Sequence, residues 1–151
     1  MSEFPLAGKV VMISGGSRGI GCAIALRAAR DGAKVVIAAK TDTPHPQLPG
    51  TIHETADLVR EAGSEALAVK MDIRDDAQVE AAVAAAVAEF GRIDVLVNNA
   101  SAISLTSVTQ TPMKRVDLLF DVNVRGTYTL TRAAIDAMSH GDGAHVVNLS
   151  P

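Results

Sequence analysis

Residues 14–21 read SGGSRGIG, which places glycines at positions 15, 19 and 21 between an apolar run and a helical pattern. The apolar run at residues 10–13 predicts a buried strand, and the spacing of apolar residues after Gly19 predicts a helix. A strand, a glycine turn and a helix N-terminus together can form a phosphate-binding site, because unpaired backbone N–H groups and the positive end of the helix dipole face the anion. The other reading of these glycines is a plain turn. We favour nucleotide binding because of the elements on either side.

The residue after the second predicted strand is Lys40. An acidic residue at this position would bind the ribose hydroxyls of NAD(H) and repel the 2′-phosphate of NADP(H). Arg18 lies inside the glycine turn and brings a second positive charge. Each side chain alone can be a solvated cation, but both together favour NADP(H) over NAD(H). Asp42 lies two residues further on and leaves NAD(H) open.

Polar side chains also follow the third and fourth predicted strands. Asp72 can accept a hydrogen bond from an adenine amine, or it can cap the next helix, a role that suits Asp75 better. Asn98 and Asn99 follow the fourth strand, and two adjacent amides are expensive to bury unless they are hydrogen-bonded. We therefore expect these amides to tie neighbouring strands together and to line a cofactor groove.

Asn123 is an unusual residue for the interior of the last long helix, and Gly126 weakens the same turn. One interpretation is a packed polar residue. The other is an active-site residue whose amide, or whose loosened backbone carbonyl, holds a water molecule.

Strand and helix patterns alternate along the chain and predict an α/β fold, a doubly wound parallel sheet with helices on both faces. The strands are expected at residues 9–14, 34–39, 66–71, 93–98 and 144–149. The helices are expected at residues 20–31, 51–61, 75–90 and 112–139, the last with Thr111 as its N-cap and Pro112 in its first turn. Ligands of such sheets bind at the carboxyl ends of the strands, where the glycine turn lies.

Composition limits the classes of function. The chain has 151 residues, 48% of them hydrophobic, and a net charge of −3, which argues against a nucleic-acid partner. No apolar stretch reaches the length of a membrane span. The single cysteine, Cys22, is expected to pack inside the first helix and fits a reducing, cytoplasmic location. His45, between two prolines of a loop, is interpreted as a solvated side chain, and no metal site is expected.

Five segments, in order, resemble the short-chain dehydrogenase/reductase family: SGGSRGIG at residue 14, Asp72, NNAS at 98, NVRGTY at 123 and HVVNLS at 145. The resemblance implies a Rossmann-type oxidoreductase that transfers a hydride between a nicotinamide dinucleotide and a small carbonyl or secondary alcohol. It implies Asn123 as a catalytic residue and a homo-oligomer, a dimer or tetramer. The cofactor-binding residues it implies are Gly15, Ser17, Arg18, Gly19, Ile20, Gly21, Lys40, Asp72, Ile73, Asn99 and Ala100.

A narrower resemblance, carried by AAKTDTPHPQLPGTIHETA, NNASAISLT and NLSP, is to the dehydrogenase domain of the hydroxysteroid dehydrogenase-like 2 subgroup. That subgroup also carries a lysine after its second strand. By this resemblance the substrate class extends to lipid-like molecules.

Two departures from the family pattern limit which catalytic residues of the family can be assigned in this sequence. The family's catalytic serine aligns with Pro151, and Ser150 matches its neighbour. The family's Tyr-x-x-x-Lys is not found, because Tyr128 comes before the fifth strand and is followed by no such lysine. We therefore expect residues 1–151 to be the N-terminal part, with the first five strands, of one dinucleotide-binding domain whose catalytic Tyr and Lys lie beyond residue 151. The part alone is expected to be inactive. The alternative is a non-catalytic nucleotide-binding sensor or scaffold that has lost the serine.

Overall fold

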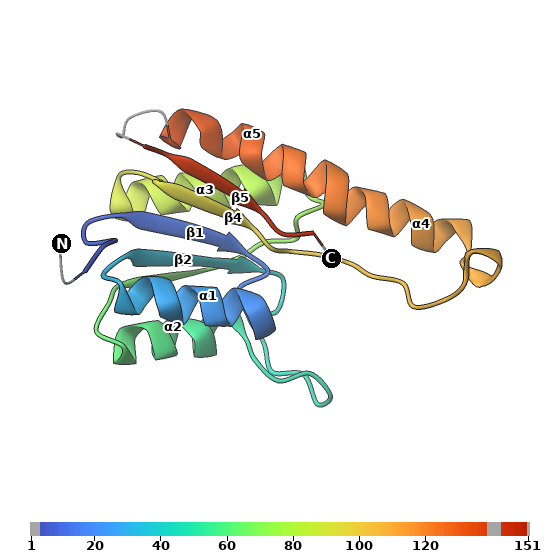
Figure 1. The fold of residues 1–151 in the computed structure, drawn as a ribbon, viewed down its shortest axis with the longest axis horizontal. Helices are drawn as coiled ribbons and strands as arrows, with labels where there is room; N and C mark the ends of the chain where they lie inside the picture. Colours follow the sequence, from blue (N-terminus) through green and yellow to red (C-terminus); the bar gives the residue numbers. More distant parts are fainter. Residues whose placement is uncertain (1–3, 139–142, 151) are drawn as a thin grey trace.

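The computed structural model describes residues 4–138 and 143–150, and within them a parallel sheet forms the centre of the molecule (Figure 1). The strand order is β3-β2-β1-β4-β5. The strands are β1 (Val10–Ser14), β2 (Lys34–Ala39), β3 (Ala66–Lys70), β4 (Val95–Asn98) and β5 (His145–Asn148). The predicted doubly wound α/β sheet is confirmed, and each strand lies within one or two residues of its predicted bounds.

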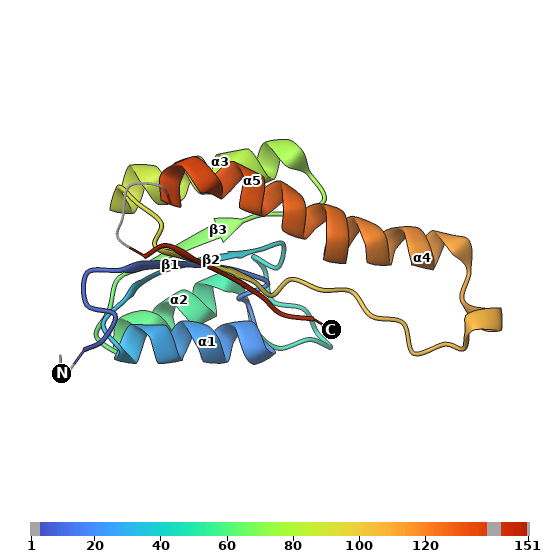
Figure 2. The same ribbon diagram turned by 45° about the horizontal axis from the view of Figure 1, so that its top comes forward.

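Helices cover both faces of the sheet (Figure 2). Helices α1 (Gly19–Arg30) and α2 (Ile52–Glu61) pack on one face, and α3 (Asp76–Phe90) and α5 (Thr127–Met138) pack on the other. Because side chains alternate along a strand, Val11 and Ile13 of β1 join the core under α1 and α2. Val10 and Met12 of the same strand join the core under α3 and α5. Cys22 is a partly buried residue of α1.

Local signals start the helices that follow β2 and β3. Thr51 forms a capping box with Glu54 at the start of α2, and Asp75 caps α3 by accepting the N–H of Gln78 at 3.1 Å. The prediction for Pro112 was wrong by one residue, since Pro112 is itself the N-cap of helix α4 (Met113–Phe120). Pro112 has the extended backbone of a cap (ψ 147°), so Met113 is the first helical residue.

The long helix predicted at residues 112–139 is divided. A π-helical segment, Asp121–Gly126, separates α4 from α5, and Ser139 lies outside the described residues. The low helix propensity of Asn123 and Gly126 weakens this turn, and tertiary contacts of both residues hold the wider turn in place. Helix α4 buries none of its residues and extends past the carboxyl ends of the strands (Figures 1 and 2).

Candidate dinucleotide site

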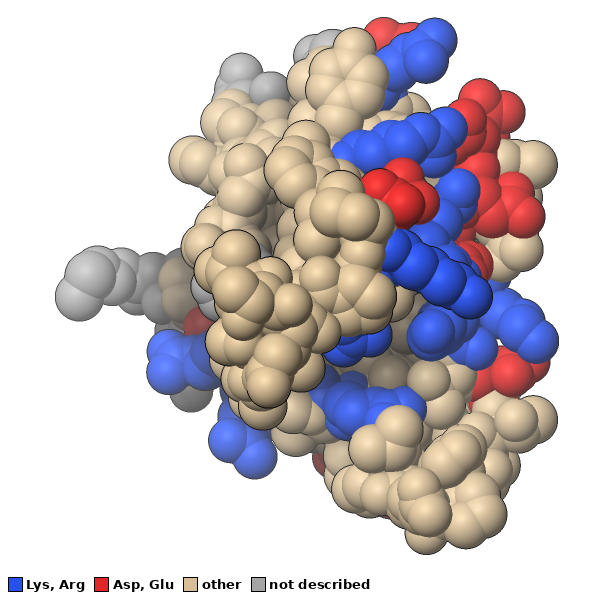
Figure 3. Space-filling model, turned by 90° about the vertical axis from the view of Figure 1, so that its right-hand side faces the viewer, with Lys and Arg blue, Asp and Glu red and all other residues tan. Residues whose placement is uncertain are grey.

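A groove of about 660 Å³ opens at the carboxyl ends of β1 and β4, where the strand order reverses direction. All eleven residues predicted to bind the cofactor line this groove: Gly15, Ser17, Arg18, Gly19, Ile20, Gly21, Lys40, Asp72, Ile73, Asn99 and Ala100. Figure 3 views this end of the molecule, where Lys and Arg side chains gather around a hollow. Among the described lining residues the basic ones are Arg18, Lys40, Arg74 and Arg115, against the single acid Asp72. The groove therefore suits an anionic ligand.

The glycine turn leaves the start of α1 open to the groove. Gly19 has a φ of +55°, and no described atom lies within 4 Å of the position that a Cβ would take. No described side chain caps α1, and its first turn holds no acidic residue. Gly21 is required for a different reason, because a Cβ there would lie 2.4 Å from the carbonyl oxygen of Gly15. An open turn with uncapped N–H groups fits the diphosphate of a dinucleotide.

Ser14 and Asn99 join the ends of β1 and β4 beneath the turn. The Ser14 Oγ accepts the backbone N–H groups of Asn99 at 3.1 Å and Ala100 at 3.0 Å. The Asn99 Nδ2 donates to the carbonyls of Ser14 at 3.0 Å and Gly15 at 3.1 Å. Sequence reasoning missed Ser14, for which the only clue was its place at the head of the glycine motif. These bonds fix the turn relative to the fourth strand.

Asn98 has a different position from the one predicted. It is buried and is not among the described residues that line the groove. Its Nδ2 donates to Asn148 Oδ1 at 2.8 Å and to Thr131 Oγ1 at 3.0 Å. The expectation that it ties neighbouring strands is confirmed, and the expectation that it lines the groove was wrong, because alternation along β4 turns it toward α5.

Arg18 and Lys40 come together at the end of the groove beside β2. The Arg18 guanidinium donates to Thr41 Oγ1 at 2.9 Å, and the side chain of Lys40 is exposed. Asp42 is paired with Lys70 at 2.9 Å, and the hydrogen bond from Lys70 holds the pKa of the Asp42 carboxyl below its usual range. Asp42 is not among the described lining residues, so the positive charge at this end is not offset by its carboxylate.

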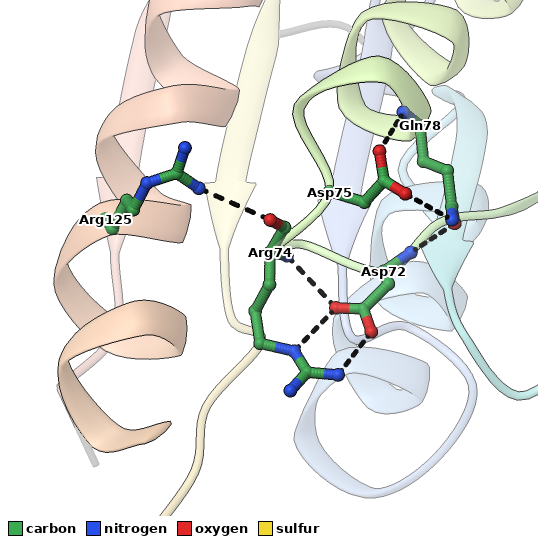
Figure 4. Close-up of polar contacts among 5 residues, drawn as sticks. All are labelled: Asp72, Arg74, Asp75, Gln78 and Arg125. Atoms are coloured by element: carbon green, nitrogen blue, oxygen red, sulfur yellow. Dashed lines mark hydrogen bonds and ion pairs between the residues drawn. The ribbon is translucent and has the colours of Figure 1, made fainter. Parts of the chain in front are cut away.

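Asp72, which follows β3 next to this end of the groove, is hydrogen-bonded by Arg74 (Figure 4). The Arg74 Nε and a terminal nitrogen donate to the two carboxylate oxygens at 3.0 and 2.6 Å, and the Arg74 backbone N–H donates at 3.0 Å. The side-chain hydrogen bonds from Arg74 are the main reason why the pKa of Asp72 lies below its usual range. Sequence reasoning missed Arg74, although its place two residues after Asp72 is the spacing of a local ion pair. The helix cap is Asp75, as expected.

Asn123 reaches the groove only through a neighbour. Its Oδ1 accepts the N–H of Ala102, and its Nδ2 donates to the carbonyl of Ala102, both at 2.9 Å. The Thr127 hydroxyl donates to the Asn123 carbonyl at 2.8 Å, and a carbonyl oxygen has a second lone pair. Ala102 lines the groove, whereas Asn123 is not among the described lining residues. The side chain thus fits the packed-polar interpretation.

Only part of the expected catalytic region lies within the described residues. Tyr128 is exposed, Ser150 is exposed at the end of the described chain, and Pro151 lies outside the described residues.

Among residues 4–138 and 143–150, no group of three His, Cys, Asp or Glu side chains is placed to hold a metal ion. His45 is an exposed loop residue whose Nδ1 accepts the N–H of Gln47 at 3.1 Å. No described helix is both long and apolar enough to cross a bilayer.

Comparisons with known proteins agree with this geometry. Residues 9–151 match the family model of the short chain dehydrogenases. Hydroxysteroid dehydrogenase-like protein 2 from Bos taurus is 56% identical and that from Homo sapiens 54% identical, each over 146 residues that make up 97% of this chain and 35% of the relative. The chain therefore spans about a third of the length of these curated relatives, and the narrower resemblance is confirmed.

Solved structures give the same result. A short chain dehydrogenase from Mycobacterium thermoresistibile is 53% identical with a TM-score of 0.93, over 97% of this chain and 52% of that one. Carveol dehydrogenase from Mycobacterium avium, in complex with NAD, is 29% identical with a TM-score of 0.84, over 95% of this chain and 55% of that one. With its sheet order, its glycine turn and these matches, the chain belongs to the short-chain dehydrogenase family of oxidoreductases.

Proposed function

We propose that this chain is the dinucleotide-binding part of a domain that transfers a hydride between NADP(H) and a carbonyl or secondary alcohol. The observation that carries the proposal is the groove itself, in which an uncapped helix start and four basic residues face the space at the ends of β1 and β4. When bound, the nicotinamide supplies or accepts the hydride. The residues of this chain bind and orient the dinucleotide and hold water near the reacting end.

The preference for NADP(H) over NAD(H) rests on the β2 end of the groove. Arg18 and Lys40 line it, and Thr41 fixes the Arg18 guanidinium. Because Asp42 is neutralised by Lys70, a 2′-phosphate at this end would meet two cations and no competing carboxylate from Asp42. The NAD bound to the carveol dehydrogenase keeps NAD(H) as the second candidate.

The other groove residues take parts that follow from their positions. The amides of Gly19 and Ile20, at the start of α1, would bind the diphosphate, since this helix start has no side-chain cap. The Asp72 carboxylate, ionised through Arg74, is an acceptor for an adenine amine. The carbonyl of Asn123 is the proposed water site, in a domain whose catalytic Tyr and Lys lie beyond residue 151.

The segment after β4 supports apolar substrates, including lipid-like ones. Residues 101–112 carry no charged side chain, and Ile103, Leu105 and Val108 are exposed there. Ser101 and Ala102, at the start of the segment, line the groove. A substrate that leaves the groove on this side would meet apolar surface.

A cytoplasmic location is proposed from the single, unpaired Cys22.

A homo-oligomer, a dimer or tetramer, is proposed from the outer face of α4 and α5. Met113, Phe120, Val124, Tyr128 and Ile135 are all more than half exposed. Their spacing of four or seven residues places them in one stripe along the joined helices. Leu130 of α5, in contrast, is fully buried in the protomer's own core.

A nucleotide-binding sensor or scaffold is the second candidate, favoured by Pro151 at the position of the family's serine. The two are separated with the full-length protein. NADPH and NADH are titrated by calorimetry, and hydride transfer is then followed with a panel of aldehydes, ketones and secondary alcohols. The oxidoreductase predicts tighter binding of NADPH and turnover with at least one substrate class. Binding without turnover on the whole panel supports the sensor, and no binding of either dinucleotide contradicts both.

A further inference from the structure

The π-helical segment and the loop after β3 meet through Arg125 (Figure 4). One terminal nitrogen of Arg125 donates to the carbonyl oxygen of Arg74 at 3.3 Å. The other donates to the carboxylate of Asp76 at 2.8 Å. Arg125 thus bonds both to the backbone of the loop and to the first turn of α3, more than 45 residues earlier in the chain.

Gly126 makes the same junction close-packed. It is buried, and a Cβ at this position would lie 2.6 Å from the Ile73 side chain. The backbone of the π-helical segment therefore rests directly on Ile73. A side chain at position 126 would push the loop away from the helix.

The loop on the other side of the junction is internally braced. The Asp72 carboxylate accepts three hydrogen bonds from Arg74, and the Asp72 N–H donates to Gln78 Oε1 at 2.9 Å. Gln78 in turn donates to the Asp75 carboxylate at 2.9 Å. A loop held this way moves as one body, so a contact at its Arg74 carbonyl sets the position of Asp72 as well.

Both partners of the junction form walls of the groove. Asp72, Ile73 and Arg74 line it from the loop, and Val122 lines it from the π-helical segment. We infer that Arg125 is a positioning residue that clamps the Asp72 wall to the segment that carries Asn123, so that the two walls keep one spacing. The contacts of Arg125 with Arg74 and Asp76 establish the clamp within the chain. Its consequence for dinucleotide binding rests on the proposed function.

The chemistry of arginine explains why this residue type is needed. The side chains of Arg125 and Asp76 are 49% and 55% exposed, so their ion pair alone adds little stability. A planar guanidinium can hold two acceptors at once in a fixed geometry, whereas a lysine ammonium at the same place keeps the charge but not the two-point contact. Arg125→Lys therefore removes the clamp while changing little else.

The test is amide hydrogen exchange of the ligand-free, full-length protein. The Arg74 and Asp75 amides are hydrogen-bonded within the loop and report its opening. Arg125→Lys should speed their exchange by about two- to fivefold and leave the central sheet unchanged. Arg132→Lys, an exposed arginine of α5, is the matched control and should change neither. Unchanged exchange at Arg74 and Asp75, or an equal rise throughout the sheet, would overturn the clamp.

Dinucleotide affinity gives the second readout. Arg125→Lys should weaken NADPH binding by about the same two- to fivefold factor, while Arg132→Lys keeps the wild-type affinity. A wild-type protein that binds no dinucleotide contradicts the proposed function, and the exchange result still decides the clamp. An Arg125→Lys variant with faster exchange but wild-type affinity would overturn the inference that the clamp positions the cofactor wall.

Discussion

Both polar atoms of the Asn123 side-chain amide hydrogen-bond the backbone of one residue, Ala102: the Oδ1 accepts its N–H and the Nδ2 donates to its C=O, each at 2.9 Å. The pair joins the π-helical segment to the chain that leaves β4. It also explains why an asparagine stands where the helix geometry is weakest. Since the amide is used in this way, the side chain holds the segment together and is already hydrogen-bonded at both of its polar atoms.

We predict that Asn123→Ala lowers the free energy of unfolding by about 1–2 kcal/mol, because the partly buried N–H and C=O of Ala102 lose their partners. Asn123→Asp should be more destabilising than Asn123→Ala, because a carboxylate oxygen would then face the Ala102 carbonyl. Urea denaturation of the three proteins at pH 7 measures both differences. An aspartate variant as stable as the wild type would contradict the two-bond arrangement.

Gly19 and Gly21 form a matched pair of tests within the glycine turn. Gly21→Ala should lower the unfolding free energy by about 3 kcal/mol, because its Cβ would meet the Gly15 carbonyl and the Asn99 amide. Gly19→Ala should lower it by about 1–2 kcal/mol through its positive φ, and should chiefly abolish dinucleotide binding by filling the open turn. Thermal unfolding and NADPH calorimetry separate the two effects. Wild-type affinity in a folded Gly19→Ala would show that no phosphate approaches Gly19.

The fold could be predicted from local patterns because, in the described sheet, every strand except β5 is flanked by strands on both sides or covered by helices. Continuous apolar runs such as residues 10–13 are typical of strands covered on both faces, and the run is fully buried here. The groove followed from topology. Once parallel strands are assumed, Gly19, Lys40, Asp72 and Asn99 must meet at one edge, and they do.

The parts that were missed depend on partners far away in sequence. Ser14 hydrogen-bonds Asn99 across 85 positions, and Asn123 pairs with Ala102 across 21. No local pattern contains those contacts, so neither the role of Ser14 nor the π-helical turn could be predicted. Asn98 was expected in the groove together with Asn99 because two adjacent amides are costly to bury, but alternation along the strand turns Asn98 toward α5, where Thr131 and Asn148 accept its hydrogen bonds.

Cofactor preference is predicted to depend on the two cations beside β2. Arg18→Ala combined with Lys40→Ala should weaken NADPH binding by about tenfold or more and leave NADH binding nearly unchanged, because only NADPH carries the 2′-phosphate. Calorimetric titrations with both dinucleotides give the ratio. Lys114→Ala, on the exposed helix α4, serves as the control and should leave the ratio unchanged. Equal losses for the two dinucleotides would point to a role in general electrostatic attraction.

The oligomer is predicted to depend on the stripe along α4 and α5. Phe120→Arg and Val124→Arg place charges on side chains that are 63% and 58% exposed in the protomer, and should shift the protein toward the monomer. Leu58→Arg, on the outer face of α2, is the matched control and should not. Sedimentation velocity measures the populations. An oligomer that persists in both stripe variants would place the interface elsewhere.

Acid stability is predicted to depend on Asp94 at the opposite edge of the sheet from the groove. Its buried carboxylate accepts the Val10 N–H at 2.9 Å and is paired with Arg92 and Lys9. Burial acts to raise the pKa of Asp94, but the Val10 N–H and the Arg92 guanidinium outweigh it, so the pKa lies below its usual value. A group with a lowered pKa in the folded state stabilises the protein above its unfolded pKa of about 3.9, and this stabilisation is lost as the pH falls through the lowered value.

Asp94→Asn should therefore lower the unfolding free energy by about 1–3 kcal/mol at pH 7, because Arg92 and Lys9 lose their charged partner. The difference from wild type should shrink as the pH falls below about 4, because Asp94 takes up a proton in the unfolded wild-type chain there while the folded carboxylate, with its lowered pKa, still keeps its charge. Urea midpoints at pH 7, 4 and 3 follow this convergence. Asp57→Asn, an exposed i,i+3 partner of Arg60, should show little difference at any pH. A constant gap between Asp94→Asn and wild type across the series would mean that Asp94 acts through packing and not through its charge.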